Sequence, residues 1–203
     1  MDARIDQLAP GKRGGCNTWL VGDTDEVIVV DPGRDAEAVL AAVSDREILA
    51  VICTHGHPGH VAAALEVAAR DEAPVALHPR DVLAWREAHR GREPDIDMAE
   101  GGIFEVAGVA LEVIHTPGHS PGSVSLYCEQ LGVVFSGDAL TADGPAPHAG
   151  EYPDFPGQVS AIGQELLTLP DETRVLPGHG EETTVETAGK LFDSWVAAGP
   201  LPD

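Results

Sequence analysis

Short apolar runs rich in β-branched residues alternate along the chain with stretches in which apolar residues recur every three or four positions. The first pattern predicts strands at 26–31, 48–54, 73–78, 109–116, 124–128, 132–137 and 173–178, and residues 17–23 are expected to pair with the first of them as a hairpin. The second pattern predicts helices at 35–45, 59–71, 81–91, 157–169 and 185–199. Strands that alternate with helices predict an α/β fold.

A weak internal repeat divides this pattern into two parts. The helix at 35–45 leads into a strand and then to Gly56 with its neighbouring histidines, and the helix at 157–169 leads into a strand and then to Gly178 and His179. We therefore expect two similar β-rich halves that face each other across one cleft, within a single domain of residues 1–203. The long loops at 91–102 and 139–157 are expected to flank the site.

Composition narrows the classes of function. The chain has 34 acidic and 12 basic residues, a formal net charge of −22 and only 4% aromatic residues. Because this charge repels phosphate backbones and anionic lipids, we expect no nucleic-acid partner and no membrane association. Residues 1–15 lack the apolar core of a signal peptide, and Cys16, Cys53 and Cys128 are too few and too widely spaced for a disulfide framework. These features predict a cytoplasmic protein, and they leave the oligomeric state open.

Histidines and one aspartate follow directly after several of the predicted strands. The set is His55, His57 and His60 in "CTHGHPGHV", His119 in "HTPGHSPGS", Asp138 in "FSGDAL" and His179 in "LPGHG". Side chains at the carboxyl ends of neighbouring strands in α/β proteins converge on one crevice. Imidazole and carboxylate together suit zinc and chemically similar metals, so the sequence predicts a metal site.

The spacing within the first cluster has a geometric reason. His55 and His57 are two residues apart, so they point the same way in an extended loop. His60 lies one turn into a helix that starts near Pro58, which can aim it at a second metal position about 3–4 Å away.

The remaining histidines are expected to have other roles. His78 is interpreted as structural, His89 as lying on an exposed helix face and His115 as a packing residue within a strand. His148 lies in a long loop that could reach a substrate.

The motifs "THGHPGH", "TPGHSPGS", "FSGDAL" and "LPGHG", in this order, resemble the metallo-β-lactamase superfamily, in particular its short glyoxalase II-like hydrolases. The motif "VVDPG" at 29–33 matches a further turn of that family, and the resemblance runs from about Asn17 to about Thr184. It implies an αββα sandwich with the metals at one edge, and a role for Asp31 in steadying the loop that carries the ligands. The ligands that it implies are His55, His57 and His119 for the first metal, His60 and His179 for the second, and Asp138 as the bridge.

The chain departs from this family in two places. The family pattern is H-x-H-x-D-H, and here Gly59 occupies the position of the aspartate that ligates the second metal. We therefore expect one metal position to be retained and the second to be weakened. In addition, only residues 180–203 follow His179, too few for the helical domain with which full-length glyoxalase II grips glutathione. In the loop 139–157, "ADGPAPHAGE" replaces the Gly-rich, Arg-bearing segment that is usual in the subgroup.

The resemblance implies a metal-dependent hydrolase, and we expect its substrate to be a small-molecule thioester or a related ester. A metal-bound hydroxide would attack the acyl carbon, with Zn²⁺ as the expected metal and Fe²⁺ as the alternative. Asp138 would orient the hydroxide, and His179 or His60 would stabilise the oxyanion or protonate the leaving group.

Two other functions remain open at this point. A mononuclear site of two histidines and Asp138 is similar to the centres of non-haem iron enzymes, which include persulfide dioxygenases of this superfamily. Alternatively, Gly59 marks a non-catalytic homologue that keeps a reduced metal site for binding or sensing.

Overall fold

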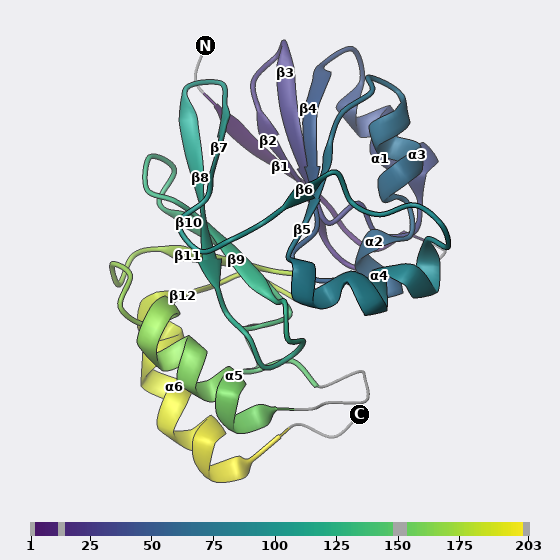
Figure 1. Ribbon diagram of the computed structural model, residues 1–203. Coiled ribbons are helices and arrows are strands. Elements are labelled where there is room, and N and C mark those ends of the chain that lie inside the picture. The colour runs from purple at the N-terminus through teal and green to yellow at the C-terminus, as the bar shows by residue number, and fades with distance from the viewer. Residues whose placement is uncertain (1–2, 12–14, 148–153, 201–203) are drawn as a thin grey trace.

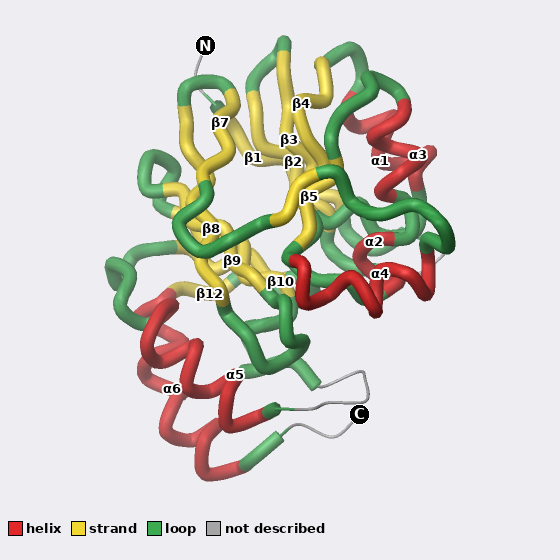
Figure 2. Tube along the Cα trace, viewed as in Figure 1, coloured by secondary structure: helices red, strands yellow, loops and turns green. Residues whose placement is uncertain are grey.

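The computed structural model describes residues 3–11, 15–147 and 154–200. Two six-stranded sheets stand face to face, and helices cover the outer side of each (Figure 1). The helix and strand layers are also distinct in the coloured trace (Figure 2). The chain therefore has the expected αββα architecture.

The first sheet is built from the N-terminal half of the chain. Its strand order is β1 (Arg4–Leu8), β2 (Thr18–Gly22), β3 (Glu26–Val30), β4 (Glu47–Ile52), β5 (Val75–Leu77) and β6 (Ile96–Asp97). Strands β2 and β3 form the expected antiparallel hairpin, whereas β3, β4 and β5 run parallel. The three parallel strands therefore end at the same edge of the sheet.

The second sheet is built from the C-terminal half. Its order is β12 (Thr183–Thr184), β11 (Arg174–Pro177), β10 (Val133–Gly137), β9 (Val124–Cys128), β8 (Val109–His115) and β7 (Ile103–Val106). Strand β9 is antiparallel to both β8 and β10, and β11 is parallel to β10. Strands β8, β10 and β11 therefore run in one direction and also share a carboxyl edge.

Helices cover the outer face of each sheet. The helices on the first sheet are α1 (Ala36–Val43), α2 (Pro58–Val61), α3 (Ala64–Ala69) and α4 (Val82–Ala88), the last after a 3₁₀ turn at Pro79–Asp81. The helices on the second sheet are α5 (Phe155–Ala161), which continues as a π-helical turn at Ile162–Leu166, and α6 (Val185–Ala198). Asp35 and Asp154 cap α1 and α5 through their side chains, which fixes where these helices begin. Within the described ranges, none of the helices combines the length and apolar character that a membrane crossing requires.

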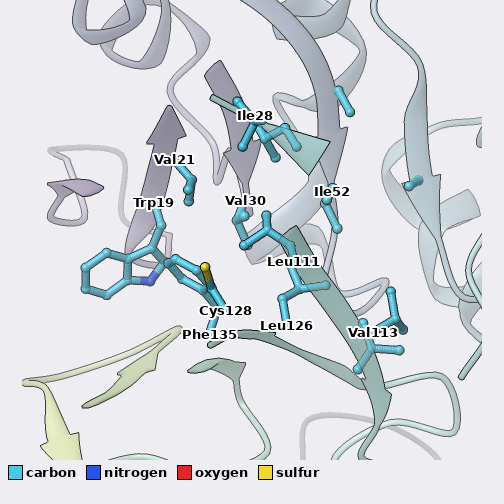
Figure 3. Packing of buried hydrophobic residues seen from close by; sticks show 14 of the residues in the cluster. Trp19, Val21, Ile28, Val30, Ile52, Leu111, Val113, Leu126, Cys128 and Phe135 are labelled. Carbon is cyan, nitrogen blue, oxygen red and sulfur yellow. The ribbon is translucent and has the colours of Figure 1, made fainter. Parts of the chain in front are cut away.

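The main hydrophobic core lies between the sheets, where Figure 3 shows Ile28 and Val30 of β3 opposite Leu111 and Leu126 of the second sheet. Strand β3 is buried on both faces, because Val27 and Val29 point outward to the helices. This explains why its sequence reads as a continuous apolar run instead of an alternating one.

Two groups of elements differ from the sequence prediction. The helix predicted at 59–71 is split into α2 and α3, because the Ala63 backbone N–H donates to Gly33 O at 2.9 Å instead of continuing the helix. The short strands β1, β6, β7 and β12 were not predicted. Strand β1 is an edge strand with exposed and half-buried positions, and β6 and β12 have two residues each. These three strands therefore carry no clear apolar pattern.

Candidate metal centre

The strand ends bring the predicted ligands together at one edge of the sandwich. His55 follows β4 in the first sheet, whereas His119, Asp138 and His179 follow β8, β10 and β11 in the second. The two sets meet across the gap between the sheets, because the ring centroids of His55 and His119 are only 4.8 Å apart. The carboxyl-edge argument from the sequence is therefore confirmed by the geometry.

Asp138 lies at the centre of this cluster. Its Oδ2 atom is 3.3 Å from His60 Nε2, 3.5 Å from the Nε2 atoms of His119 and His179, and 3.9 Å from His55 Nε2. One carboxylate oxygen thus faces four imidazole nitrogens that come from three separate segments, which follow β4, β8 and β11.

The distances between ring nitrogens match those of atoms that share a metal ion. His57 Nδ1 is 3.1 Å from His119 Nε2, and His60 Nε2 is 3.2 Å from His179 Nε2. In a tetrahedral zinc site with bonds of about 2.05 Å, neighbouring ligand atoms are about 3.3 Å apart. His55, His57 and His119 offer ligand atoms that all lie within 4.8 Å of one another.

Asp31 fixes the orientation of two of these rings. Its Oδ2 accepts hydrogen bonds from His60 Nδ1 at 2.9 Å and from Thr54 Oγ1 at 2.7 Å. Because the Thr54 hydroxyl donates to Asp31, it accepts from His55 Nδ1, which lies 3.1 Å away. Both histidines thus carry a proton on Nδ1 and turn Nε2 toward Asp138, which is the nitrogen that a bound metal would use.

Asp31 has φ of 50°, in the left-handed region, where Asp is among the few tolerated residues. Its backbone carbonyl accepts a hydrogen bond from Thr18 Oγ1 at 2.6 Å, and its carboxylate also accepts from the Thr54 N–H at 2.7 Å. The expectation that Asp31 steadies a ligand loop is therefore matched by its contacts.

Burial and neighbouring charges set the protonation of the cluster. Burial lowers the pKa of His55 well below its ordinary value. Burial acts in the same direction on His60, but the neighbouring carboxylates of Asp138 and Asp31 outweigh it and hold the pKa of His60 well above the usual range. Burial alone would raise the pKa of Asp138, yet the surrounding imidazoles, His60 first, lower it strongly. The centre therefore holds an ionised carboxylate beside a neutral His55.

Two buried atoms of the cluster lack a hydrogen-bond partner among the described residues: His55 Nε2 and Asp138 Oδ1. Buried polar atoms are nearly always paired, so unpaired ones require an explanation. A metal ion would satisfy the His55 nitrogen, and a metal or its water would satisfy the Asp138 oxygen. The donor set, the nitrogen spacing and these two atoms together fit a metal centre.

Two glycines border the cluster, and they differ in the room that each would leave for a side chain. A Cβ on Gly178 would lie 2.4 Å from Asp138 Oδ1 and 2.6 Å from His60 Cε1, so only glycine fits there. At Gly59 no described heavy atom lies within 4 Å of the position a Cβ would take. There is therefore room for a carboxylate side chain at position 59.

The Cys16 thiol lies close to the cluster, because its sulfur and the ligand atoms of Asp31 and His60 are all within 4.8 Å of one another. Its Sγ atom donates to Asp31 O at 3.6 Å, and burial raises the pKa of its thiol, which keeps it protonated and a poor ligand. Cys16, Cys53 and Cys128 are all free and buried.

Three further histidines, His78, His89 and His115, lie outside the cluster. His78 and His115 stack in parallel, with ring centroids 4.5 Å apart, in agreement with their predicted structural roles. The prediction for His89 was wrong: its Nε2 contacts Val61 O at 2.8 Å and ties α4 to α2, so it is not on an exposed face. His148 lies outside the described residues.

Two supporting residues escaped the sequence analysis. Gln158 Nε2 donates to Asp138 O at 3.1 Å and to Ala139 O at 2.9 Å, which fixes the Asp138 loop against α5. Asn17 Nδ2 donates to the carbonyls of Pro177 and Gly180, both at 3.0 Å, and so holds the His179 loop. The only available signal for Gln158 was a polar residue within the buried pattern of a helix.

Comparison with known proteins adds an independent line of evidence. The family model described as "Metallo-beta-lactamase superfamily" matches residues 11–179. The probable metallo-hydrolase YqgX of Bacillus subtilis (strain 168) is 33% identical over 189 residues, which cover 84% of this chain and 88% of the relative. Hydroxyacylglutathione hydrolase GloC of Haemophilus influenzae is 28% identical over 185 residues, which cover 83% and 87%.

Solved structures show the same similarity. The BLEG-1 B3 metallo-beta-lactamase superposes with a TM-score of 0.82 at 29% identity, covering 94% of this chain and 97% of that one. TTHA1623 in a di-iron-bound form superposes with a TM-score of 0.78 at 31% identity, covering 91% of this chain and 97% of that one. ETHE1 from Myxococcus xanthus superposes with a TM-score of 0.76 at 26% identity, covering 90% of this chain and 80% of that one.

Proposed function

Because the chain belongs to the metallo-beta-lactamase superfamily, we propose that it is a metal-dependent hydrolase that acts on small thioesters or related esters. The observation that carries the proposal is the convergence of imidazole nitrogens on Asp138 from separate strand ends, with the rings of His55 and His60 oriented by Asp31.

The residues divide into two positions for a metal. His55, His57 and His119 would hold the first ion, with Asp138 shared. His60 and His179 are the remaining ligands for a second ion. This second position has no carboxylate of its own, because residue 59 is a glycine. When bound, the metal lowers the pKa of a coordinated water toward about 7 and polarises the substrate carbonyl.

The side chains supply orientation and proton handling. Asp138 Oδ1, which has no partner among the described residues, is available to accept a hydrogen bond from the attacking water and to fix its direction. Water adds to the acyl carbon, the C–S bond breaks, and the products are a carboxylate, a thiol and one proton. The His179 side chain is 48% exposed, so it lies where a substrate arrives and can donate to the carbonyl oxygen or to the leaving sulfur.

The substrate class is supported by relatives and by chemistry. GloC, which covers most of this chain, is named as a hydroxyacylglutathione hydrolase, an enzyme that cleaves a thioester. A thiolate leaves without strong acid assistance, which suits a centre that lacks one acidic group.

The test is thioester hydrolysis together with metal analysis. We expect protein purified without added metal to contain zinc or iron, and chelation to abolish hydrolysis of an acyl-glutathione substrate. His55→Ala should lose both metal and turnover, whereas His89→Ala, a histidine outside the cluster, should keep both. Full hydrolysis after complete metal removal would contradict the proposal, and metal binding without turnover would favour the non-catalytic homologue.

One observation favours a second candidate function. His55, His60 and Asp138 form a buried group of two histidines and a carboxylate, the ligand set of non-haem iron oxygenases. TTHA1623, a structural relative, was solved in a di-iron-bound form. If the chain is an iron-dependent persulfide dioxygenase, it should contain iron and consume oxygen when a persulfide is added, without thioester hydrolysis.

A further inference from the structure

Asp81 has the sequence position of a helix cap but not the contacts of one. It ends the 3₁₀ turn after β5 and directly precedes α4, yet its side chain makes no capping hydrogen bond to that helix. The residue is only 1% exposed. A buried carboxylate requires partners, and the partners of Asp81 lie on other loops.

The carboxylate joins the two loops that carry the first-position histidines. Its Oδ2 accepts hydrogen bonds from the Gly56 N–H at 2.9 Å and from Ser120 Oγ at 2.6 Å, and its Oδ1 accepts from the Gly122 N–H at 2.6 Å. Gly56 lies between His55 and His57, and Ser120 directly follows His119. One side chain therefore bridges the first sheet and the second at the metal centre.

The surroundings are shaped for this contact. A Cβ on Gly56 would lie 2.5 Å from Asp81 O, and a Cβ on Gly122 would lie 2.7 Å from Asp81 Oδ1. Neither glycine has a positive φ, so space is what restricts these positions. Ser123 Oγ, 2.7 Å from Ser120 Oγ, completes the chain of hydrogen bonds.

We propose that Asp81 is a positioning residue that sets the distance between the His55–His57 loop and the His119 loop, and thereby the geometry of the first metal position. The inference rests on the proposed metal centre. Asp81 does not touch the ligand rings in these contacts, so it acts through backbone N–H groups and one hydroxyl. Charge-assisted hydrogen bonds of this kind are short and strong, which suits a residue that must hold loops in place.

The amide variant removes this function with little change of shape. In Asp81→Asn one oxygen becomes an NH₂ group, which must face either the Gly122 N–H or the pair formed by Gly56 and Ser120. A donor then faces a donor, and the two loops lose their common acceptor.

The experiment is a cobalt titration that records both affinity and the visible ligand-field spectrum. We expect Asp81→Asn to bind cobalt roughly 10- to 100-fold more weakly than the wild type and to show an altered spectrum. Asp71→Asn is the matched control, because Asp71 also accepts a backbone hydrogen bond, from Ile48 N at 2.8 Å, but lies away from the centre. It should leave affinity and spectrum unchanged. Far-ultraviolet circular dichroism and urea unfolding establish that each variant is folded.

A second variant covers the case in which Asp81→Asn does not fold. Ser120→Ala removes one of the three contacts and should weaken cobalt binding by roughly threefold to tenfold, because the other two remain. A folded Asp81→Asn, or in its absence a folded Ser120→Ala, with wild-type affinity and spectrum would overturn the inference while the metal centre stands. A wild-type protein that binds no cobalt would instead refute the proposed centre and the role of Asp81 with it.

Discussion

Gly178 is the position where the smallest substitution should damage the proposed centre most. Its N–H donates to Gly137 O at 2.8 Å and its carbonyl accepts from Asn17 N at 2.7 Å, so the backbone is held on both sides. In Gly178→Ala the new methyl group would lie 2.4 Å from Asp138 Oδ1 and 2.6 Å from His60 Cε1. Since ordinary contacts of a Cβ begin at 3.4 Å, these atoms must separate by about 1 Å.

The magnitude follows from that displacement. Overpacking of this kind costs about 1–3 kcal/mol of stability, which a folded domain of this size can tolerate. The site is more sensitive, because a misplacement of about 1 Å can reduce catalysis by about 100-fold. We therefore expect Gly178→Ala to remain folded while losing metal affinity and about two orders of magnitude of hydrolysis. The assays are cobalt titration, metal content per chain and thioester hydrolysis on the same preparation.

Gly59→Ala is the matched control for this prediction. It makes the same chemical change beside His60, but no described atom lies within 4 Å of the new methyl group. We expect its metal affinity and activity to stay within about threefold of the wild type, since open space imposes no displacement. If Gly178→Ala also retained wild-type affinity and hydrolysis, the claim that Asp138 and His60 need their present positions would be refuted.

Three further outcomes are expected. Gly59→Asp should raise the metal content from about one to about two ions per chain, because the new carboxylate completes a two-metal site in open space. Gly59→Asn, which adds no carboxylate, should leave the metal content unchanged. Equal metal content in the two variants would refute the role of the missing carboxylate. Thr54→Val breaks the link between Asp31 and His55, and it should weaken cobalt binding roughly 10- to 100-fold in a titration; unchanged binding would contradict the assigned ring orientation. Chelation should lower the free energy of unfolding by about 2.7 kcal/mol relative to protein in metal at 100 times its Kd, as measured by urea unfolding, and His55→Ala should show no such difference.

The regular part of the fold was accessible from the sequence because burial leaves a clear pattern. Strand β3 reads as a continuous apolar run since both of its faces are covered, and β2 was expected beside it. The break between α2 and α3 was not accessible. It depends on a hydrogen bond from Ala63 to Gly33, about 30 residues earlier in the chain, and an alanine-rich segment gives no local sign of it.

The residues of the proposed centre were brought together on paper for a similar reason: they lie at or shortly after the ends of strands, and strand ends can be read from local pattern. Their supports could not be found in this way. Asp81 has a local interpretation as a helix cap, and only the fold shows that its oxygens face Gly56 and Gly122 instead. Gln158 likewise acts through carbonyl groups about 20 residues away, at Asp138 and Ala139. A hydrogen bond to a backbone atom does not require a particular residue type at the partner position. Such contacts therefore leave little trace in the sequence.

The distribution of these supports argues that the two proposed metal positions are unequal. At the first position, the His55 ring is oriented through Thr54, and the loops on both sides share the Asp81 carboxylate. At the second, His60 is held by Asp31, but the His179 side chain is 48% exposed and position 59 supplies no carboxylate. A half-exposed side chain loses more conformational entropy than a buried one when a metal fixes it, and a site without its anionic ligand also loses electrostatic attraction for a divalent ion. Both effects weaken the second position, so we expect the first ion to bind more tightly and His60 and His179 to remain available to substrate when only one ion is present.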